Sequence, residues 1–302
     1  MLNLIYKDMS TKGPVTPKGF GDIKPEGAKS RRAFINKVVP ILEEAGFQPL
    51  ETPTVEFAET LLGKYGEEEK LIYQFEDKGG RKLALRYDLT VPLARFVANN
   101  LGLLSPTFSR YQIGQVFRGE NPQKGRKREF TQFDFDTVGS EDTLVDVKVI
   151  ITTLKCSRVA GLNTAILQIN DREVFDNAGC TPEQISAIDK MDKIGREEVE
   201  KTVPNLNEII NSPKPKRLAE IFNILKDKGF VENTDYIYNP CLARGLNYYT
   251  STIFELKLDK TPNGLSIGGG GRYDNLIGVF AGKKIPAVGF SFGLDRIVEL
   301  TQ

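Results

Sequence analysis

The residues best suited to chemistry alternate with large apolar residues in one short segment. Gln132, Asp134 and Asp136 alternate with Phe133 and Phe135. A β-strand points successive side chains to opposite faces, so the three polar groups are predicted to share one face and the two rings the other. Carboxylates on such a face can bind an amine, while the opposite face can enter a core.

Cationic side chains lie next to this segment. Arg118 and Glu120 end the stretch 112–120, which the polar loop 121–128 joins to the stretch 129–139, so an antiparallel hairpin is predicted. A guanidinium binds phosphate or carboxylate through a planar fork, and loop cations can reach a polyanion. The loop contains Lys124, Arg126, Lys127 and Arg128. The alternative is a solvated hairpin with cross-strand ion pairs.

Three further groups are unspecific when each is taken alone. The glycine run 268–271 fits a flexible turn, a bulge or a close approach of backbone to ligand, but it matches neither a P-loop nor a dinucleotide fingerprint. Arg244 precedes Tyr248 and Tyr249, which are typical of core tyrosines with a satisfied hydroxyl. Arg296, near the start of a predicted final helix, suits either a cation over an aromatic ring or a surface charge.

Composition excludes several mechanisms. The 302 residues include no histidine, so a Ser–His or Cys–His pair and a His-ligated zinc are impossible. A net charge of +1 excludes a strongly basic nucleic-acid coat but leaves room for a local basic patch. Cys156, Cys180 and Cys241 are an odd number and far apart, which argues against a disulfide framework or a zinc ribbon. With no signal peptide and no apolar run of about 20 residues, a reduced, soluble, cytoplasmic protein is expected.

Hydrophobic spacing predicts the elements that position these groups. A helix is expected over 26–45, followed at 47–56 by an extended segment whose two prolines suit an edge or interface strand. Ser140 is expected to cap a helix over 140–160. Further strands are predicted at 82–88, before a helix that begins near Thr90, and at 165–170 and 248–258.

The residue composition changes between 173 and 239, where the sequence is highly charged and its hydrophobic spacing predicts helices. Thr181 begins a capping box with proline at the next position, and another helix is expected over 218–228. We therefore predict a small helical insertion domain, with 1–172 and 240–302 forming the core. Mostly antiparallel strands with helices favour an α+β fold.

The order of these pieces resembles the catalytic core of class II aminoacyl-tRNA synthetases and, within that class, the histidyl-tRNA synthetase family. The resemblance extends over nearly the whole chain. Segments 26–56, 117–132 and 289–296 resemble class motifs 1, 2 and 3. More specific likenesses are PKGFGD at 17–22, LRYDLT at 85–90 in the style of the eukaryotic and archaeal branch, and the histidine-specific segments ARGLNYYT at 243–250 and GGGRYD at 269–274.

The resemblance implies activation of L-histidine by ATP with Mg²⁺, transfer to the acceptor stem of tRNA(His), and a homodimer through motif 1. Arg118 and Arg244 would be catalytic, with Arg244 stabilising charge at the α-phosphate. Arg118, Glu120, Arg126 and Arg296 would bind ATP. The histidine pocket would comprise Asp88, Thr90, Gln132, Asp136, Tyr248, Tyr249 and Tyr273. Lys124, Arg126, Lys127 and Arg128 would contact the tRNA acceptor end.

This mechanism agrees with the composition. Attack of a carboxylate on a phosphorus atom needs alignment and charge neutralisation rather than a general base, so arginines suffice. No metal held by histidine or cysteine is expected.

Two departures from the family pattern leave an alternative open. Asn247 stands where the family has aspartate, and the chain ends shortly after motif 3, so the anticodon-binding domain is expected to be absent. Histidine-binding regulatory subunits of ATP phosphoribosyltransferase resemble such a chain and do not aminoacylate. Retention of Arg118, Arg244 and Arg296 favours the synthetase. A synthetase-like RNA-binding or scaffolding protein would not need an intact amino-acid pocket.

Overall fold

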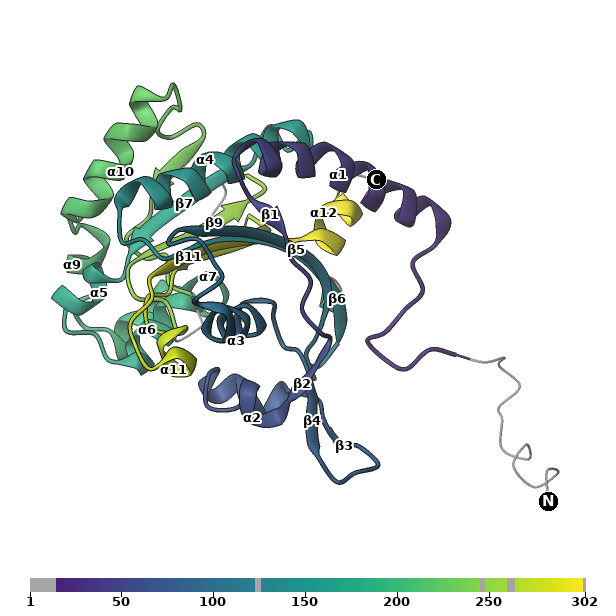
Figure 1. Cartoon of the computed structure of the whole chain (residues 1–302). Coiled ribbons are helices and arrows are strands. Elements are labelled where there is room, and N and C mark those ends of the chain that lie inside the picture. Colours follow the sequence, from purple (N-terminus) through teal and green to yellow (C-terminus); the bar gives the residue numbers. More distant parts are fainter. Residues whose placement is uncertain (1–14, 123–125, 245–247, 260–263, 301–302) are drawn as a thin grey trace, which may run out of the picture.

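A computed structural model of the protein describes residues 15–122, 126–244, 248–259 and 264–300 (Figure 1). An eight-stranded sheet runs through the molecule in the order β1-β5-β6-β11-β10-β9-β7-β8. The outermost pairs, β1 with β5 and β7 with β8, are parallel, and the inner pairs are antiparallel. The α+β prediction with a mainly antiparallel sheet is thus confirmed. The strands are β1 (Gln48–Pro49), β5 (Phe108–Phe117), β6 (Glu129–Val138), β7 (Ile166–Asp171), β8 (Tyr236–Tyr238), β9 (Thr252–Lys257), β10 (Ser266–Arg272) and β11 (Ala287–Gly293).

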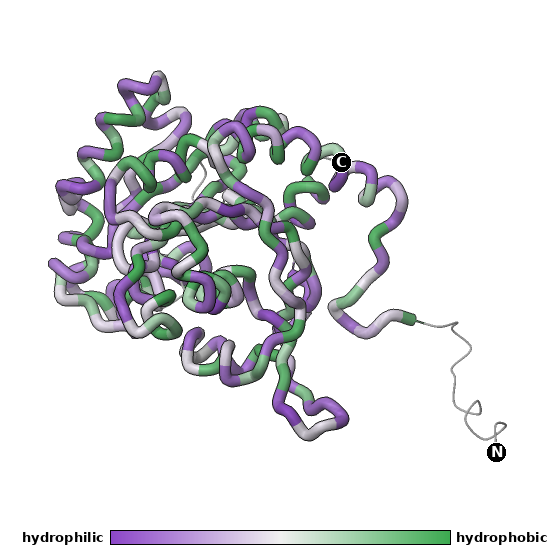
Figure 2. Tube along the Cα trace, in the orientation of Figure 1, coloured by the Kyte–Doolittle hydropathy of each residue, from purple (hydrophilic) through white to green (hydrophobic). Residues whose placement is uncertain are grey.

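One face of this sheet is apolar and packs beneath four helices. They are α1 (Pro25–Glu44), α4 (Thr143–Val159), α10 (Lys216–Asp227) and α12 (Leu294–Leu300). Their apolar residues join Phe133 and Phe135 in one core, as the alternation in β6 predicts. Figure 2 shows hydrophobic and hydrophilic residues alternating along α1 and α10, the pattern of amphipathic helices. Helix α1 has proline at its first position, and Gly46 beyond its end has a φ of 79°.

The other face has polar groups at its centre and a second core around them. Helix α3 (Thr90–Asn100) contacts α11 (Gly278–Ala281) and α2 (Ala58–Leu61) there. The remaining helices on this side come from the region after β7. They are α5 (Glu173–Asn177), α6 (Pro182–Asp189), α7 (Met191–Ile194), α8 (Arg196–Thr202) and α9 (Leu206–Ile210). Within the described ranges no helix is long and apolar enough to cross a membrane.

The charged region 173–239 is helical for most of its length, and its capping box is present. The Thr181 hydroxyl accepts from the backbone N–H of Gln184, whose side chain accepts from the Thr181 backbone. The region also contributes β8 to the main sheet, and α10 packs on α4. The division into an insertion domain and a core stays a prediction.

The proline-containing segment 47–56 contributes to two sheet edges. Strand β1 is an edge of the main sheet, and β2 (Val55–Phe57) is an edge of a small sheet with the order β2-β4-β3. Its other strands are β3 (Gln74–Glu76) and β4 (Lys82–Leu85), with the 3₁₀ helix η2 (Gly66–Leu71) before β3. The prediction of an edge strand is confirmed, because proline cannot donate to a central ladder.

Several predicted details were wrong. Asp142, not Ser140, caps α4, because its carboxylate accepts from the Leu144 backbone N–H at 2.8 Å. Of the alternatives for the glycines at 268–271, only the turn is wrong: they lie inside strand β10, and the register shift between Ser266 and Gly268 fits the bulge. Strands β4 and β9 are shorter than the predicted 82–88 and 248–258.

Candidate functional site

The floor of the candidate site is the polar face of β5, β6 and β11. Asp136 lies opposite Arg110 on β5 and Gly289 on β11. A Cβ at Gly289 would lie 1.8 Å from the Asp136 carboxylate, so only glycine leaves room for this side chain. The alternation of β6 and the gap at Gly289 therefore fix where the carboxylate lies.

Asp136 and Arg110 form a fully buried ion pair. Nη2 of Arg110 lies 2.8 Å from Oδ2 of Asp136 and also donates to the Leu89 carbonyl at 3.1 Å. The Tyr273 hydroxyl donates to Oδ1 of Asp136 at 2.5 Å. Burial raises the pKa of Asp136, opposed by the charge of Arg110 and the hydrogen bond from Tyr273. Sequence reasoning missed Arg110, whose role depends on the strand register.

Asp88 lies just before helix α3 and faces the same site. Its Oδ1 accepts from the backbone N–H groups of Thr90 and Val91 at 3.1 and 3.0 Å and from the Tyr65 hydroxyl at 3.0 Å. Its Oδ2 is buried without a hydrogen-bond partner among the residues described. Burial raises the pKa of Asp88, partly offset by these donors. One oxygen thus anchors the carboxylate, and the other remains available.

Three tyrosines form one wall of the site. The ring centroids of Tyr248 lie 4.9 Å from Tyr249 and 5.9 Å from Tyr273. Burial is the largest cause that raises the pKa of each hydroxyl. Tyr248 is hydrogen-bonded to the Thr90 side chain, and Tyr249 to Tyr248. The tyrosines therefore remain neutral hydrogen-bonding groups at neutral pH.

Arg118 lies beyond the end of β5, held between two aromatic rings. Its guanidinium carbon is 4.4 Å from the ring centroid of Tyr87 and 5.1 Å from that of Phe130. Its Nε donates to the Tyr87 carbonyl at 3.2 Å. Stacking fixes the plane of the guanidinium and leaves its edge available to an anion.

Arg244 occupies the space left by the glycine strand. A Cβ at Gly269 would lie 1.9 Å from its Nη1, which donates to Glu255 at 3.2 Å. The Ser266 hydroxyl donates to the same carboxylate oxygen at 2.8 Å, and Arg296 donates to the Ser266 carbonyl. Sequence reasoning missed Glu255 and Ser266, which link two predicted arginines; Glu255 lies directly opposite Gly269 in the register.

The hairpin loop carries the remaining cations. Arg126 pairs with Glu120 at 3.4 Å, and Lys127 with Glu299 at 2.9 Å. Arg128 donates to the carbonyls of Glu120 and Lys18, so its guanidinium holds the segment before α1 against the hairpin. A depression of about 260 Å³ is lined by Gly19, Phe20, Gly21, Pro122, Arg126 and Lys127. Lys124 and Asn247 lie outside the described residues.

Unsatisfied acceptors are concentrated in this site. In the described part of the chain, more than half of the buried side-chain polar atoms without a hydrogen-bond partner belong to five residues of this site. The five are Asp88, Arg110, Gln132, Asp134 and Asp136. Four of these atoms are oxygens, and that of Asp136 is in ion-pair contact with Arg110. The four are Oδ2 of Asp88, Oε1 of Gln132, Oδ1 of Asp134 and Oδ2 of Asp136. Such a group of acceptors suits a ligand that presents several N–H donors.

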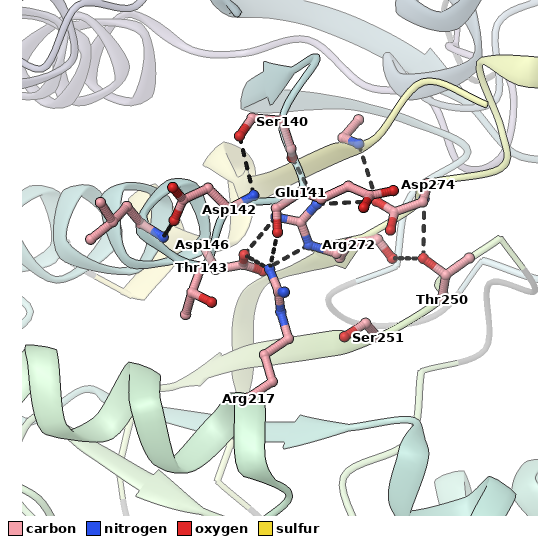
Figure 3. A network of polar contacts seen from close by, with 12 residues as sticks. Ser140, Glu141, Asp142, Thr143, Asp146, Arg217, Thr250, Ser251, Arg272 and Asp274 are labelled. Atoms are coloured by element: carbon pink, nitrogen blue, oxygen red, sulfur yellow. Dashed lines mark hydrogen bonds and ion pairs between the residues drawn. The ribbon is translucent and has the colours of Figure 1, made fainter. Parts of the chain in front are cut away.

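A separate buried network is centred on Asp146 and Arg272 (Figure 3). Arg272, next to Tyr273, donates to both carboxylate oxygens of Asp146 at 3.2 and 2.5 Å. Its third nitrogen donates to Asp274 at 3.1 Å and to the Ser140 carbonyl at 3.0 Å. Arg217 on α10 also donates to Asp146. The fully engaged Arg272 positions the strand end that carries Tyr273.

A mainly antiparallel sheet with buried carboxylates on its polar face, where Arg118 acts on Asp88 and Arg244 on the tyrosine wall, defines a class II aminoacyl-tRNA synthetase-like catalytic domain. A family model described as histidyl-tRNA synthetase matches residues 19–212 and 172–297. The histidine–tRNA ligase of Aeropyrum pernix is 41% identical, over 95% of this chain and 74% of its own length. The chain therefore belongs to the histidyl-tRNA synthetase family.

Solved structures agree with this assignment. The crystal structure of histidyl-tRNA synthetase from Nostoc sp. PCC 7120 matches with a TM-score of 0.81 and 28% identity, covering 95% of this chain and 74% of that one. An ATP phosphoribosyltransferase regulatory subunit/histidyl-tRNA synthetase from Bacillus halodurans matches with a TM-score of 0.78 and 21% identity, covering 95% and 83%. The second likeness shows the fold alone.

Proposed function

We propose that this chain activates L-histidine with ATP to form histidyl-adenylate and then transfers the histidyl group to tRNA(His). The observation that carries the proposal is the arrangement of the polar face. Arg118 is stacked on Tyr87 and acts on Asp88, and Arg244 is linked to Arg296 through Glu255 and Ser266. These cations suit phosphates, and the buried acceptors of the polar face suit an amino acid. Class II synthetases use such an arrangement, and the family relationship supports it.

In the first step a carboxylate oxygen of histidine attacks the α-phosphorus of ATP. A new P–O bond forms, the bond to the bridging oxygen breaks, and pyrophosphate leaves. Arg118 and Arg244 neutralise the charge that develops on the phosphoryl oxygens, Arg296 contacts adenine and the γ-phosphate, and Glu120 lies at the adenine edge with Arg126 beside it. Preorganised cations are effective here because they need no rearrangement during the reaction.

The amino-acid end of the site would hold histidine through its N–H groups. The free Oδ2 of Asp88 accepts from the α-ammonium, with Thr90 and Gln132 beside it. Asp136, Tyr249 and Tyr273 surround the imidazole, and Tyr248 closes the wall. In the second step a ribose hydroxyl of the tRNA terminus attacks the activated carbonyl, and AMP leaves.

The alternative is a histidine-binding regulatory subunit of ATP phosphoribosyltransferase, a class of protein with the same fold. Such a subunit needs the acidic pocket but has no use for a positioned Arg244. The contact of Arg244 with Gly269 and Glu255 argues for catalysis.

The tRNA contact is assigned to the cations of the hairpin loop. Arg126 and Lys127 are partly exposed beside the depression, whereas Arg128 is engaged with backbone carbonyls. We therefore assign phosphate contacts to Arg126 and Lys127, with Lys124 from the same loop, and a smaller contact to Arg128. ATP brings its Mg²⁺ on the phosphates, and a cytoplasmic location agrees with three free cysteines.

A homodimer through motif 1 is supported by an exposed apolar sheet face. Phe57 and Phe75 both lie opposite Leu83 in the small sheet, and they are 49% and 43% exposed. Val55 continues this face. An unpartnered apolar face of this kind is expected to pack against a second copy of the chain. Sedimentation of Phe57→Glu, against wild type, tests the assignment; an unchanged molecular mass would contradict it.

Histidine-dependent exchange of pyrophosphate into ATP tests the proposed activity. Exchange is expected with L-histidine and not with other amino acids, and its absence at saturating ATP and Mg²⁺ would exclude the synthetase. Arg244→Ala is expected to reduce exchange by at least about 100-fold, the scale of losing one charge-stabilising donor, without abolishing histidine binding. Arg196→Ala, which removes an exposed arginine paired with Glu200, is the matched control and should retain activity.

A further inference from the structure

Resting on the proposed function, we propose that Asp134 is a third carboxyl group of the histidine pocket and shares a single proton with the imidazole of bound histidine. The complex then holds one proton in the Asp134–imidazole pair over a wide pH range. The proton lies either on the carboxyl group, which donates to the ring, or on the ring, which donates to the carboxylate.

The position of Asp134 follows from the strand register. It lies between Gln132 and Asp136 on the same face of β6, opposite Gln112 on β5 and Ser291 on β11. A ligand that contacts both Gln132 and Asp136 therefore passes directly over Asp134. Only 3% of the residue is exposed, so its carboxyl group is withdrawn from water.

The hydrogen bonds of Asp134 leave one oxygen unused. Ser291 is hydrogen-bonded to the carboxyl group. The Ser291 oxygen accepts from Nε2 of Gln132 at 3.2 Å, which leaves the hydroxyl proton for Asp134. Oδ1 of Asp134 has no partner anywhere in the described ranges. A buried oxygen without a partner is costly unless a ligand supplies one.

The neighbouring charges are already assigned to other partners. Asp136 pairs with Arg110 at 2.8 Å, and the free oxygen of Asp88 faces the α-ammonium in the proposed complex. Arg86 donates to the carbonyls of Gln115 and Thr52 at 2.7 Å. The titratable and charged groups that act on Asp134 or respond to it are Arg86, Asp88, Arg110, Asp136, Tyr249 and Tyr273.

Charge balance then selects one proton for the remaining pair. The ammonium offsets Asp88, Arg110 offsets Asp136, and the charge of Arg86 is also balanced by Glu56 and Glu51, so a neutral pair of Asp134 and imidazole is favoured. With no proton the pair is a buried anion, and with two it is a buried cation; both are unfavourable away from water. Burial raises the pKa of Asp134 to about 7, close to that of a free imidazole at about 6.5. The proton affinities of the two groups are therefore close enough for one proton to be shared between them.

Proton counting distinguishes this arrangement from simple binding of a neutral ring. At pH 8 free Asp134 and free histidine have both lost most of their proton, so binding takes up close to one proton. At pH 5.5 each carries most of one, so binding releases close to one. Asp134→Asn removes the shared site, and the variant should then take up no proton at the ring at pH 8. Any contribution of the α-ammonium is common to both proteins.

Calorimetric titration with histidine measures these numbers in two buffers of different ionisation enthalpy at each pH, phosphate and Tris at pH 8 and acetate and MES at pH 5.5. Asp171→Asn is a matched control, because Asp171 is also buried, also has a pKa raised by burial, and accepts from Ser251 at 2.8 Å. It should keep the wild-type proton count. Equal counts in wild type and Asp134→Asn would overturn the inference. If no histidine binds the wild type at all, the proposed function fails instead.

A measurement on the wild type alone protects the test against a variant that does not fold. Histidine labelled with ¹⁵N in the ring is bound to the protein and followed by NMR from pH 6 to pH 8. The ring shifts are expected to stay nearly constant and to lie between those of neutral and protonated imidazole. A ring that titrates near pH 6.5 in the complex, as free histidine does, would overturn the inference.

Discussion

Two buried clusters of aspartate and arginine lie in this molecule, and their polar atoms are satisfied to different degrees. Around Asp146, both carboxylate oxygens and all three nitrogens of Arg272 are hydrogen-bonded (Figure 3). In the proposed histidine pocket, Asp88 and Asp134 each retain a buried oxygen without a partner among the described residues. Both clusters are withdrawn from water, so the difference does not arise from exposure.

The number of buried polar atoms without a partner distinguishes a structural cluster from a binding site. A complete network stabilises one conformation of the strand and helix that it joins, and adding a ligand would displace a partner. An incomplete network leaves buried polar groups unpaired, which destabilises the empty protein. A ligand that supplies the missing donors removes this penalty, so binding is favoured. The pocket is therefore expected to tolerate neutralisation and the Asp146 cluster is not.

The largest effect is expected from breaking the complete network. Asp146→Asn removes the fully buried carboxylate that pairs with two nitrogens of Arg272 and leaves only Asp274 to offset the charge. Removal of one partner of a buried pair costs about 3–5 kcal/mol. We expect urea unfolding to show a loss of this size. A loss below about 1 kcal/mol would mean that the Asp146 cluster is not the structural one. The control, Asp176→Asn, changes an exposed carboxylate on the short helix α5 and should leave stability unchanged.

The polar face of β6 could be predicted from the sequence because its cause is local. Alternation of phenylalanine with polar residues at 132–136 determines which side chains face the core, and the structure confirms it. The capping box at Thr181 is local in the same way. Periodicity and capping involve residues a few positions apart, and these can be recognised without knowing the fold.

The partners of these side chains could not be predicted, because they depend on register and on distant segments. Arg110 meets Asp136 only because the two strands pair in one register. Glu255 meets Arg244 across a glycine-rich strand whose composition fits a turn, a bulge or a close backbone approach. Asp146 and Arg272 lie on elements far apart in the chain. The family resemblance supplied the proposed roles of the arginines but not these contacts.

The second prediction tests the incomplete cluster through pH. Asp134 binds its proton more tightly in the folded protein than in the unfolded chain, where its pKa is near 3.8, so unfolding releases a proton between about pH 4 and pH 7. Stability therefore falls as the pH rises through this window. At about 1.4 kcal/mol for each tenfold change in proton affinity, the loss reaches up to about 4 kcal/mol by pH 8.

Asp134→Asn should remove this loss. We expect the variant to be more stable than wild type at pH 8, by up to that amount, and similar to it at pH 4, as measured by urea unfolding at both pH values. A variant that is less stable than wild type at pH 8 would show that the Asp134 carboxylate is structurally required, as Asp146 is.

The third prediction supplies the missing partner instead of removing the charge. Histidine at 100 times its dissociation constant should stabilise the protein by about 2.7 kcal/mol, because it binds only the folded state. Thermal unfolding with and without histidine measures the shift. Asp88→Asn removes the charge proposed to face the α-ammonium and should lose most of the shift. The same shift in Asp146→Asn, measured where that variant is folded, would confirm that the two clusters act independently.

The smallest effect is expected at Arg217, at the margin of the Asp146 network, where its Nε is buried without a hydrogen-bond partner among the described residues. Arg217 on α10 donates to Asp146 and to the Glu141 carbonyl, and its side chain is 26% exposed. Without the Arg217 side chain, Asp146 keeps its pair with Arg272. Arg217→Ala is therefore expected to cost only about 1–2 kcal/mol, the scale of a charged hydrogen bond. Urea unfolding and histidine affinity should be measured on the same sample. An unchanged affinity with this modest loss would place Arg217 in the structural cluster, because that cluster acts on the fold and not on the ligand. A weakened affinity would mean that the network behind Tyr273 also sets the shape of the pocket, and the separation of the two clusters would fail.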